Sequence, residues 1–207
     1  LGVLWFKFVP DNPKQSPYVN EAELEHINDG RENTVEAKEI APWGKLLKSS
    51  QFWSLGLQFM ITDYIMYVFL AWLPLYLMEV HGFSLSKMGL WAAAPWLSLM
   101  AVVSCCGYLS DKAIAAGFSQ NLVKTSTGAV GILLCACTLF IATRTADPMM
   151  NVFWLSVALG SLGLTMSASW SSVISMGGRF AGSVSGWMNF WGNIGGVLAP
   201  SVTAWVA

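Results

Sequence analysis

Five apolar segments constrain the fold of this chain more than any other feature of its sequence. A membrane-spanning helix needs about 20 residues. Each of the five segments meets that length, and they cover residues 52–78, 88–109, 122–142, 149–176 and 184–206. Lipid offers no hydrogen-bond partner to a bare backbone, and none of the segments alternates apolar and polar residues as a barrel strand does. The sequence therefore predicts an all-α polytopic membrane protein with its transmembrane domain in residues 49–207.

The composition agrees with a membrane protein and argues against several other classes. Hydrophobic residues make up 55% of the chain and charged residues 11%, and the formal net charge is −1. A nucleic-acid partner is not predicted, because no basic stripe is present to neutralise a phosphate backbone. Neither a metal nor a cofactor is predicted, because the cysteines lie inside apolar runs and lack the paired spacing of a zinc site. These cysteines, interpreted as packing residues, are Cys105, Cys106, Cys135 and Cys137.

The first part of the chain is different in character. Residues 1–9 are apolar but too short to cross a bilayer, so we expect them to be the end of a preceding membrane helix. Residues 10–48 are rich in Asp, Asn, Pro, Lys and Glu, which predicts a water-exposed connector. Within it, Asn20 is expected to cap a short helix that begins at Glu21, since acidic residues favour the first turn of a helix.

The basic residues predict how the spans are oriented. Cytoplasmic loops carry an excess of Lys and Arg. If the connector is cytoplasmic, nine of the 11 basic residues lie inside and two lie outside. The inside group is Lys7, Lys14, Arg31, Lys38, Lys45, Lys48, Lys112, Lys124 and Arg179, and the outside group is Lys87 and Arg144. We therefore expect a multi-pass protein of the cell membrane with a cytoplasmic connector.

An ionisable residue, Asp63, lies about halfway along the first apolar segment. An acidic side chain at membrane depth is costly and marks an ion, proton or substrate path by default. The alternative is that Asp63 satisfies a neighbouring helix beside an aqueous cavity. Tyr64 and Tyr67 are three residues apart on one helical face, so both hydroxyls are expected to point into one cavity.

Two further polar groups interrupt the last two apolar segments. Ser169 and Trp170 belong to a patch of serines around one large aromatic residue, which suits the wall of a binding cavity. Small hydroxyl residues also serve as contacts between helices, and that alternative stays open. Asn189 and Asn193 are four residues apart, so both amides lie on one face and can bind a carboxylate or a hydroxyl group. The alternative is close packing of a glycine-rich helix.

The hexapeptide GYLSDK, Gly107 to Lys112, closes the second apolar segment and is expected in an inside loop. Gly107 would let two helices approach, and Asp111 would cap a helix or pair with a basic residue. The remaining polar and aromatic signals predict no chemistry. His26 and His81 are expected to be surface histidines without triad or metal partners. Trp72, Pro74 and Tyr76 are interpreted as a proline kink and an interfacial aromatic belt.

Three stretches of the sequence resemble a known family. They are the connector around residues 9–27, the run YVFLAWLPLYL at residues 67–77, and the Arg, Gly, Asn and Pro pattern of residues 179–200. Together they resemble the anion:cation symporter family of the Major Facilitator Superfamily, which is related to animal phosphate, sialic acid and vesicular glutamate carriers. The resemblance implies the C-terminal half of the Major Facilitator fold, incomplete. Residues 1–9 would end helix six, residues 10–48 would form the central loop, and the five spans would be helices seven to eleven.

The resemblance also implies a function. The chain is expected to take part in transport of a small organic anion by proton symport with alternating access. The anion would be a sugar acid, meaning a hexonate, hexuronate or aldarate, and the location would be the bacterial inner membrane. Residues facing the substrate would be Tyr67, Trp170, Asn189 and Asn193. The proton-coupling acids and an anion-binding arginine are expected in an N-terminal half that this sequence lacks.

Some residues depart from the family pattern, and other functions stay open. Asp63 is not expected on helix seven of this family. The GYLSDK motif resembles the superfamily's gating loop, but only Lys112 follows the aspartate where a cluster of arginines is usual. The alternatives are an exporter of a drug or metabolite with the same fold, or a membrane subunit that does not transport. No catalytic constellation is visible, so an enzyme is not expected.

Overall fold

The computed structural model describes residue 10 and residues 13–28 and 41–206. The predicted end of a preceding helix, residues 1–9, lies outside the described residues. The chain divides into two compact units, unit 1 with Leu1–Ile40 and unit 2 with Ala41–Ala207. In unit 1 a 3-10 helix η1 covers Pro13–Gln15 and α2 covers Glu21–Asn28. As predicted, Asn20 caps α2, because its Oδ1 accepts a 2.8 Å hydrogen bond from the Glu23 amide.

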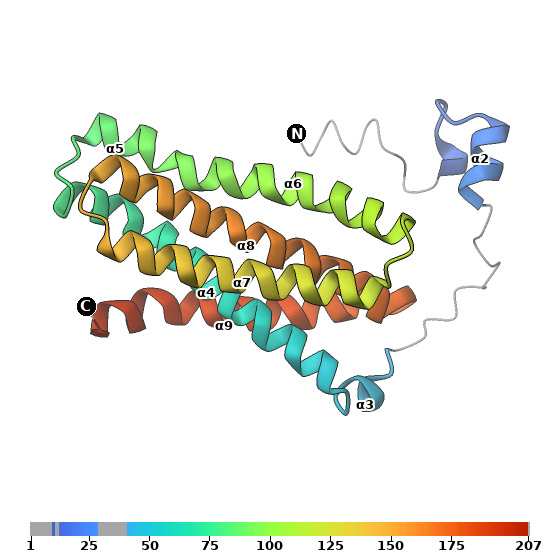
Figure 1. The fold of residues 1–207 in the computed structure, drawn as a ribbon. Coiled ribbons are helices and arrows are strands. Elements are labelled where there is room, and N and C mark those ends of the chain that lie inside the picture. The colour runs from blue at the N-terminus through green and yellow to red at the C-terminus, as the bar shows by residue number, and fades with distance from the viewer. Residues whose placement is uncertain (1–9, 11–12, 29–40, 207) are drawn as a thin grey trace. The chain divides into compact units, whose positions relative to one another are not determined.

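Among the residues that the structure describes, unit 2 consists of helices joined by short turns and contains no strand, which confirms the all-α prediction. Four helical stretches are long and apolar enough to cross a membrane, and the last of them runs for 59 residues. A 3-10 turn, η2, divides this stretch into two helices, and α9 folds back along α8 (Figure 1). The helices are α3 (Trp43–Leu46), α4 (Ser50–Glu79), α5 (Leu85–Trp91), α6 (Ala93–Ala115), α7 (Gln120–Arg144), α8 (Pro148–Gly177), η2 (Gly178–Phe180) and α9 (Ala181–Val206).

The second apolar segment, predicted at residues 88–109, is longer at both ends. It begins at Leu85, is divided at Ala92 into α5 and α6, and continues in α6 to Ala115. The motif Gly107–Lys112 therefore lies on the last turns of α6 and not in a loop. The helix continues because Ala113 to Ala115 favour helix, and it ends just before Gly117, whose φ of +98° suits a glycine.

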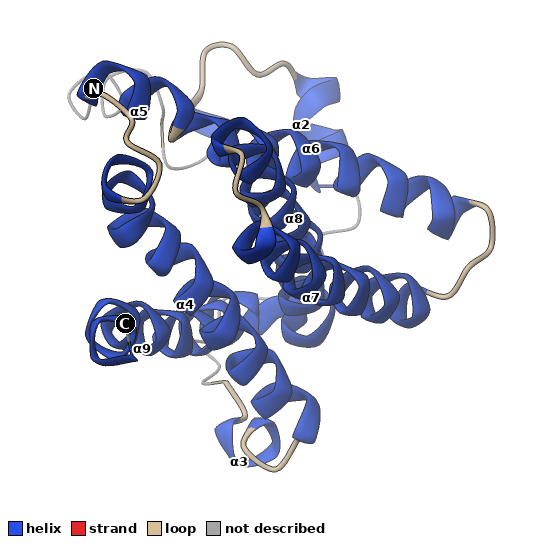
Figure 2. Cartoon of the chain, turned by 60° about the vertical axis from the view of Figure 1, so that its left-hand side comes forward, coloured by secondary structure: helices blue, strands red, loops and turns tan. Residues whose placement is uncertain are grey.

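Small residues bring the helices of unit 2 together. α4 packs along α9, while α6 and α7 pack on two sides of α8 (Figure 2). A Cβ added at Gly163 of α8 would lie 3.1 Å from the Leu99 carbonyl oxygen of α6. A Cβ added at Gly131 of α7 would lie 2.7 Å from the Ser161 carbonyl oxygen of α8. In lipid no hydrophobic driving force brings helices together, so association depends on close packing, and glycine permits it by letting the backbones touch.

Apolar side chains divide into a core and an outer surface. The core centres on α8, where Ala158, Leu159 and Leu162 are fully buried. Large apolar side chains on the outer surface suit contact with lipid, because lipid tails are as apolar as these side chains. Examples are Leu70, Leu90, Leu97, Leu133, Phe140, Phe153, Ile174 and Val197.

The helix directions separate the basic residues of unit 2. α4, α7 and α9 begin at the end of the unit where α6 and α8 finish (Figure 1). We call this the first end and the opposite one the second end. The first end carries Lys45, Lys48, Lys112, Lys124 and Arg179, whereas the second end carries Lys87 and Arg144. This distribution is the one that the positive-inside rule predicts for a first end in the cytoplasm.

Candidate substrate-binding site

The contact between α4 and α9 brings several predicted residues together. A Cβ added at Gly196 would lie 2.9 Å from ring carbons of Tyr67, so the tyrosine ring rests on the α9 backbone. The carboxylate of Asp63 lies against Gly192 in the same way. Asp63 is half-buried, and Tyr67 keeps 38% of its surface exposed. Both side chains are therefore held by glycines of α9 and keep open surface.

Trp170 of α8 joins this surface through Phe59. The Phe59 ring lies against Gly192, where an added Cβ would be 2.8 Å from the ring. Phe59 and Trp170 meet edge to face, with ring centroids 6.3 Å apart and an interplanar angle of 84°. The indole of Trp170 is 42% exposed, so it provides apolar surface next to the α4–α9 contact.

Asn189 and Asn193 use part of their hydrogen-bonding capacity within α9. Asn189 Nδ2 donates to the Ser185 carbonyl oxygen at 2.9 Å, and Asn193 Nδ2 donates to the Asn189 carbonyl oxygen at 2.8 Å. An amide has two N–H donors and an acceptor oxygen. Among the described residues, each amide thus retains its oxygen and one N–H for another partner. Asn193 precedes Gly196 by three residues, which places it on the same side of α9 as the Tyr67 contact.

Two predicted residues do not join this group. The Tyr64 hydroxyl lies 3.2 Å from Thr203 Oγ1 near the end of α9, so it points away from the Tyr67 contact with Gly196. Ser169 is buried, where its hydroxyl accepts a 3.0 Å hydrogen bond from Gln58 Nε2 and donates to the Thr165 carbonyl oxygen. Tyr64 and Ser169 therefore link helices to one another. We define the α4–α9 face as Phe59, Asp63, Tyr67, Trp170, Asn189 and Asn193.

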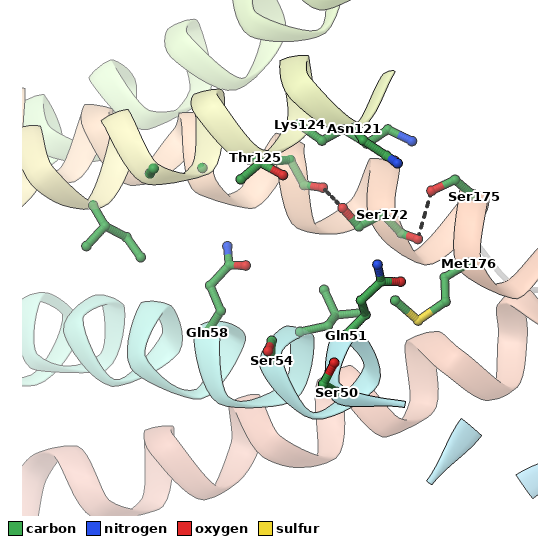
Figure 3. A pocket seen from close by; sticks show the side chains of 15 residues that line it. Ser50, Gln51, Ser54, Gln58, Asn121, Lys124, Thr125, Ser172, Ser175 and Met176 are labelled. Carbon is green, nitrogen blue, oxygen red and sulfur yellow. Dashed lines mark hydrogen bonds between the residues drawn. The ribbon is translucent and has the colours of Figure 1, made fainter. Parts of the chain in front are cut away.

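A separate polar cavity of about 630 Å³ lies between α4, α7 and α8, near the first end of unit 2 (Figure 3). Lys124 is the cation in its lining, and Figure 3 shows it among serine, threonine and amide side chains. This cavity was not predicted from the sequence. The pattern that could have predicted it is the polar residues four apart at the start of the first apolar segment, namely Ser50, Ser54 and Gln58. On α7 the corresponding residues are Asn121, Lys124, Thr125 and Gly128.

The cavity and the α4–α9 face lie on different sides of α4. Gln58, which lines the cavity, and Asp63 are five residues apart, which corresponds to about 140° around the helix axis. The predicted substrate residues therefore do not line the polar cavity. In the part of the chain that the structure describes, no group of three His, Cys, Asp or Glu side chains could hold a metal ion.

The GYLSDK motif lies outside both sites. Asp111 is exposed on α6, and Lys112 Nζ lies 4.6 Å from the centroid of the Tyr108 ring. A Cβ added at Gly107 would meet no described atom within 4 Å. The expectation that Gly107 brings two helices together is therefore not met within the described residues.

The prediction that His81 is an ordinary surface residue is wrong. His81 is half-buried, and its Nε2 lies 3.2 Å from the Tyr76 hydroxyl. Asn151 Nδ2 donates to the same hydroxyl at 3.0 Å. Tyr76, interpreted from the sequence as part of an aromatic belt, thus links α4 to a histidine and a buried asparagine. Residues 76, 81 and 151 are too far apart in sequence for their spacing to indicate this contact.

Comparison with known proteins places the chain among transporters. A D-galactonate transporter of Escherichia coli is 27% identical over 217 residues, which cover 100% of this chain and 50% of that protein. A probable sulfoacetate transporter, SauU, of Cupriavidus necator is 30% identical over 97% of this chain and 46% of its own length. A chloroplastic ascorbate transporter of Arabidopsis thaliana is 27% identical over 99% of this chain and 38% of its own length.

This chain thus spans half or less of the length of these relatives. The relatives are transporters by name and not enzymes, and several are named for anions. The family model described as Major Facilitator Superfamily matches residues 1–200. Since that match covers most of the sequence and the described helices are of membrane-spanning length, the chain belongs to the Major Facilitator Superfamily.

Proposed function

We propose that this chain forms part of a carrier that moves a sugar acid, a hexonate, hexuronate or aldarate, across a membrane by proton symport. The observation that carries the proposal is the α4–α9 face, where a carboxylate and aromatic rings pack at glycines of α9 and two amides of the same helix keep unused hydrogen-bonding groups. The names of the relatives support the substrate class, because one is named for D-galactonate and others are named for ascorbate and sulfoacetate.

The chemistry of the α4–α9 face suits a polyhydroxylated carboxylate. Asn189 and Asn193 each retain an amide oxygen, which accepts a hydrogen bond from a hydroxyl group, and one N–H, which donates to a carboxylate. The bond that each amide makes to its own helix restrains the side chain, so less entropy is lost on binding. Trp170 offers a ring face for the carbon skeleton.

Asp63 is our candidate for the coupling proton. It lies at membrane depth in α4, and among the described residues its carboxylate has no hydrogen-bond partner. An unpaired carboxylate is costly in that environment and favours binding of a proton. Proton binding to a group on the α4–α9 face would link the charge of Asp63 to substrate binding on the same surface.

The transport pathway in this proposal is completed by residues outside this chain. The relatives are two or more times as long, and carriers of this kind rock two helical halves about a site near the middle of the membrane. We propose that an N-terminal half supplies the cation that binds the substrate carboxylate, and that the connector faces the cytoplasm of a bacterial inner membrane. Gly107, Asp111 and Lys112 would then lie at the cytoplasmic side and take part in gating.

Uptake by the complete carrier in proteoliposomes tests this proposal. A panel of hexonates, hexuronates, aldarates and aromatic acids would be offered with and without an inward proton gradient. We expect accumulation of one sugar acid that disappears when the gradient is collapsed. Efflux of an apolar compound without uptake of any acid would support the alternative of a drug or metabolite exporter, whose substrate would contact the aromatic part of the face, Phe59, Tyr67 and Trp170.

A further inference from the structure

A partly buried hydrogen-bond network joins three helices at the second end of unit 2. It contains Tyr76 near the end of α4, His81 in the turn between α4 and α5, and Asn151 in the first turns of α8. Neither the α4–α9 face nor the polar cavity contains these residues. This network therefore has no part in the proposed binding site, and its role must follow from its own chemistry.

Asn151 holds this network in place and determines which groups in it donate and which accept. Its side chain is fully buried, and Nδ2 donates to the Ala142 carbonyl oxygen at 2.8 Å and to the Tyr76 hydroxyl at 3.0 Å. The Ala142 carbonyl belongs to the last turn of α7 and also accepts a 3.1 Å hydrogen bond from the Thr145 amide. Because an amide nitrogen only donates, the Tyr76 oxygen must accept the hydrogen bond from Asn151.

The direction of this bond leaves the Tyr76 proton available for His81. Tyr76 Oη accepts from Asn151, so its own proton is free to be donated to His81 Nε2, 3.2 Å away. An imidazole nitrogen accepts only when it carries no proton. A neutral His81 whose proton is on Nδ1 would accept this proton and satisfy both groups.

Protonation of His81 would break this arrangement. Nε2 would then carry a hydrogen and could no longer accept from Tyr76, so the tyrosine hydroxyl would have to turn and its proton would need another acceptor. The Asn151 Oδ1 atom is buried and has no hydrogen-bond partner among the described residues, so this network already has one unsatisfied acceptor. Histidine is the side chain whose charge changes between pH 5 and pH 8.

The turn that holds His81 is ordered by local contacts. Gly82 has a φ of +64°, which allows the chain to turn back, and the Phe83 amide donates to the Leu77 carbonyl oxygen at 3.0 Å. The Phe83 side chain is buried. The His81 ring lies between Tyr76 and Phe83, with centroid distances of 5.1 Å and 6.4 Å. The Phe83 amide therefore reports on whether this turn is closed.

The charged residues around the turn belong to four elements, and most have other contacts. Lys87 of α5 lies with its Nζ 4.6 Å from the centroid of the Phe83 ring, and Arg144 of α7 stacks on Phe140. Asp147 caps α8 by accepting from the Met150 amide at 2.8 Å. Glu79 at the end of α4 is exposed. Tyr76 is thus the hydrogen-bond partner of the imidazole among the described residues.

We propose that the hydrogen bond between Tyr76 and neutral His81 is a proton-sensitive latch. While His81 is neutral, the bond holds the α4–α5 turn against the junction of α7 and α8. Protonation of His81 releases the turn and loosens the end of α4 at the membrane surface. This proposal concerns the second end of the helices and does not depend on which substrate is carried.

Hydrogen exchange of the chain in lipid nanodiscs, followed by mass spectrometry from pH 8 to pH 5, tests the latch. After correction for the intrinsic pH dependence of exchange, we expect protection of a peptide containing Phe83 to fall about fivefold at low pH, as for the loss of one hydrogen bond. His81→Gln should keep protection high at every pH, because its amide oxygen accepts but does not titrate. Tyr76→Phe should lower protection equally at both pH values.

Controls separate release of the turn from general unfolding. His26→Gln changes the histidine of unit 1 and should leave the pH profile as it is in the unchanged chain. Peptides from α9 should keep the same protection throughout the pH range. The proposal is overturned by a flat profile in the unchanged chain, by the same pH dependence in His81→Gln, or by a loss of protection that extends to α9.

Discussion

The carboxylate of Asp63 on α4 rests directly on Gly192 of α9, so closely that a Cβ at position 192 would overlap with Oδ2. Phe59 lies against the same glycine from one turn earlier in α4. A group at membrane depth that carries or loses a charge is thus placed at a crossing of two helices. The contribution of this crossing to stability and the role of the Asp63 charge can be tested by separate substitutions.

Gly192→Ala should destabilise unit 2. The added methyl group has no room beside Asp63 Oδ2 and the Phe59 ring, and overpacking of this kind costs about 1–3 kcal/mol. Thermal unfolding in detergent should show the decrease. Gly186→Ala on the same helix is the matched control, because nothing lies within 4 Å of its Cβ, and it should be neutral or stabilising. Equal effects of the two variants would contradict the close contact.

Asn193→Ala and Asn189→Ala should weaken substrate binding by the complete carrier. Each variant removes one amide of the α4–α9 face, and a hydrogen bond contributes about 0.5–1.5 kcal/mol net, so KM for uptake should rise about three- to tenfold. Trp170→Ala should also raise KM, through loss of apolar contact. Gln120→Ala, which changes an exposed amide of α7 outside both this face and the polar cavity, is the control. Unchanged kinetics in all three variants would exclude the face as the substrate site.

Asp63→Asn should separate substrate movement from the proton gradient. Asparagine has nearly the shape of aspartate but does not bind a proton as a carboxylate does. We expect gradient-driven accumulation to be lost, while exchange of labelled for unlabelled substrate continues. Both are measured with the same proteoliposomes. Accumulation at the normal level would show that the coupling proton binds elsewhere.

Asn151→Ala should destabilise unit 2 more than a change to an exposed asparagine. It removes the hydrogen bonds that a fully buried side chain donates to the Ala142 carbonyl and the Tyr76 hydroxyl, and a hydrogen bond contributes about 0.5–1.5 kcal/mol net. Chemical denaturation in mixed micelles measures the difference from Asn193→Ala, whose side chain is exposed. Similar stabilities would mean that water replaces the lost donors.

The sequence alone determined which residues are helical and which family the chain resembles. Ser50–Glu79 and Pro148–Gly177 had to form helices because apolar segments of this length can satisfy their backbone groups in lipid only internally. The second apolar segment was an exception, since it is divided at Ala92 and its end was predicted too early. The polar letters of GYLSDK suggested a loop there, although the residues that follow favour helix. Local polarity was a poorer guide there than helix propensity and the position of Gly117.

Only the tertiary structure decided which side chains meet. Helical spacing puts Tyr64 and Tyr67 on one side of α4, yet α9 directs them to Thr203 and Gly196, separate positions along its length. The contact of Tyr76 with His81 and Asn151 likewise depends on where three helix ends converge. The physical reason is that the period of a helix specifies angles around its own axis, whereas the neighbours of each face are set by packing of glycines and side chains far apart in the sequence.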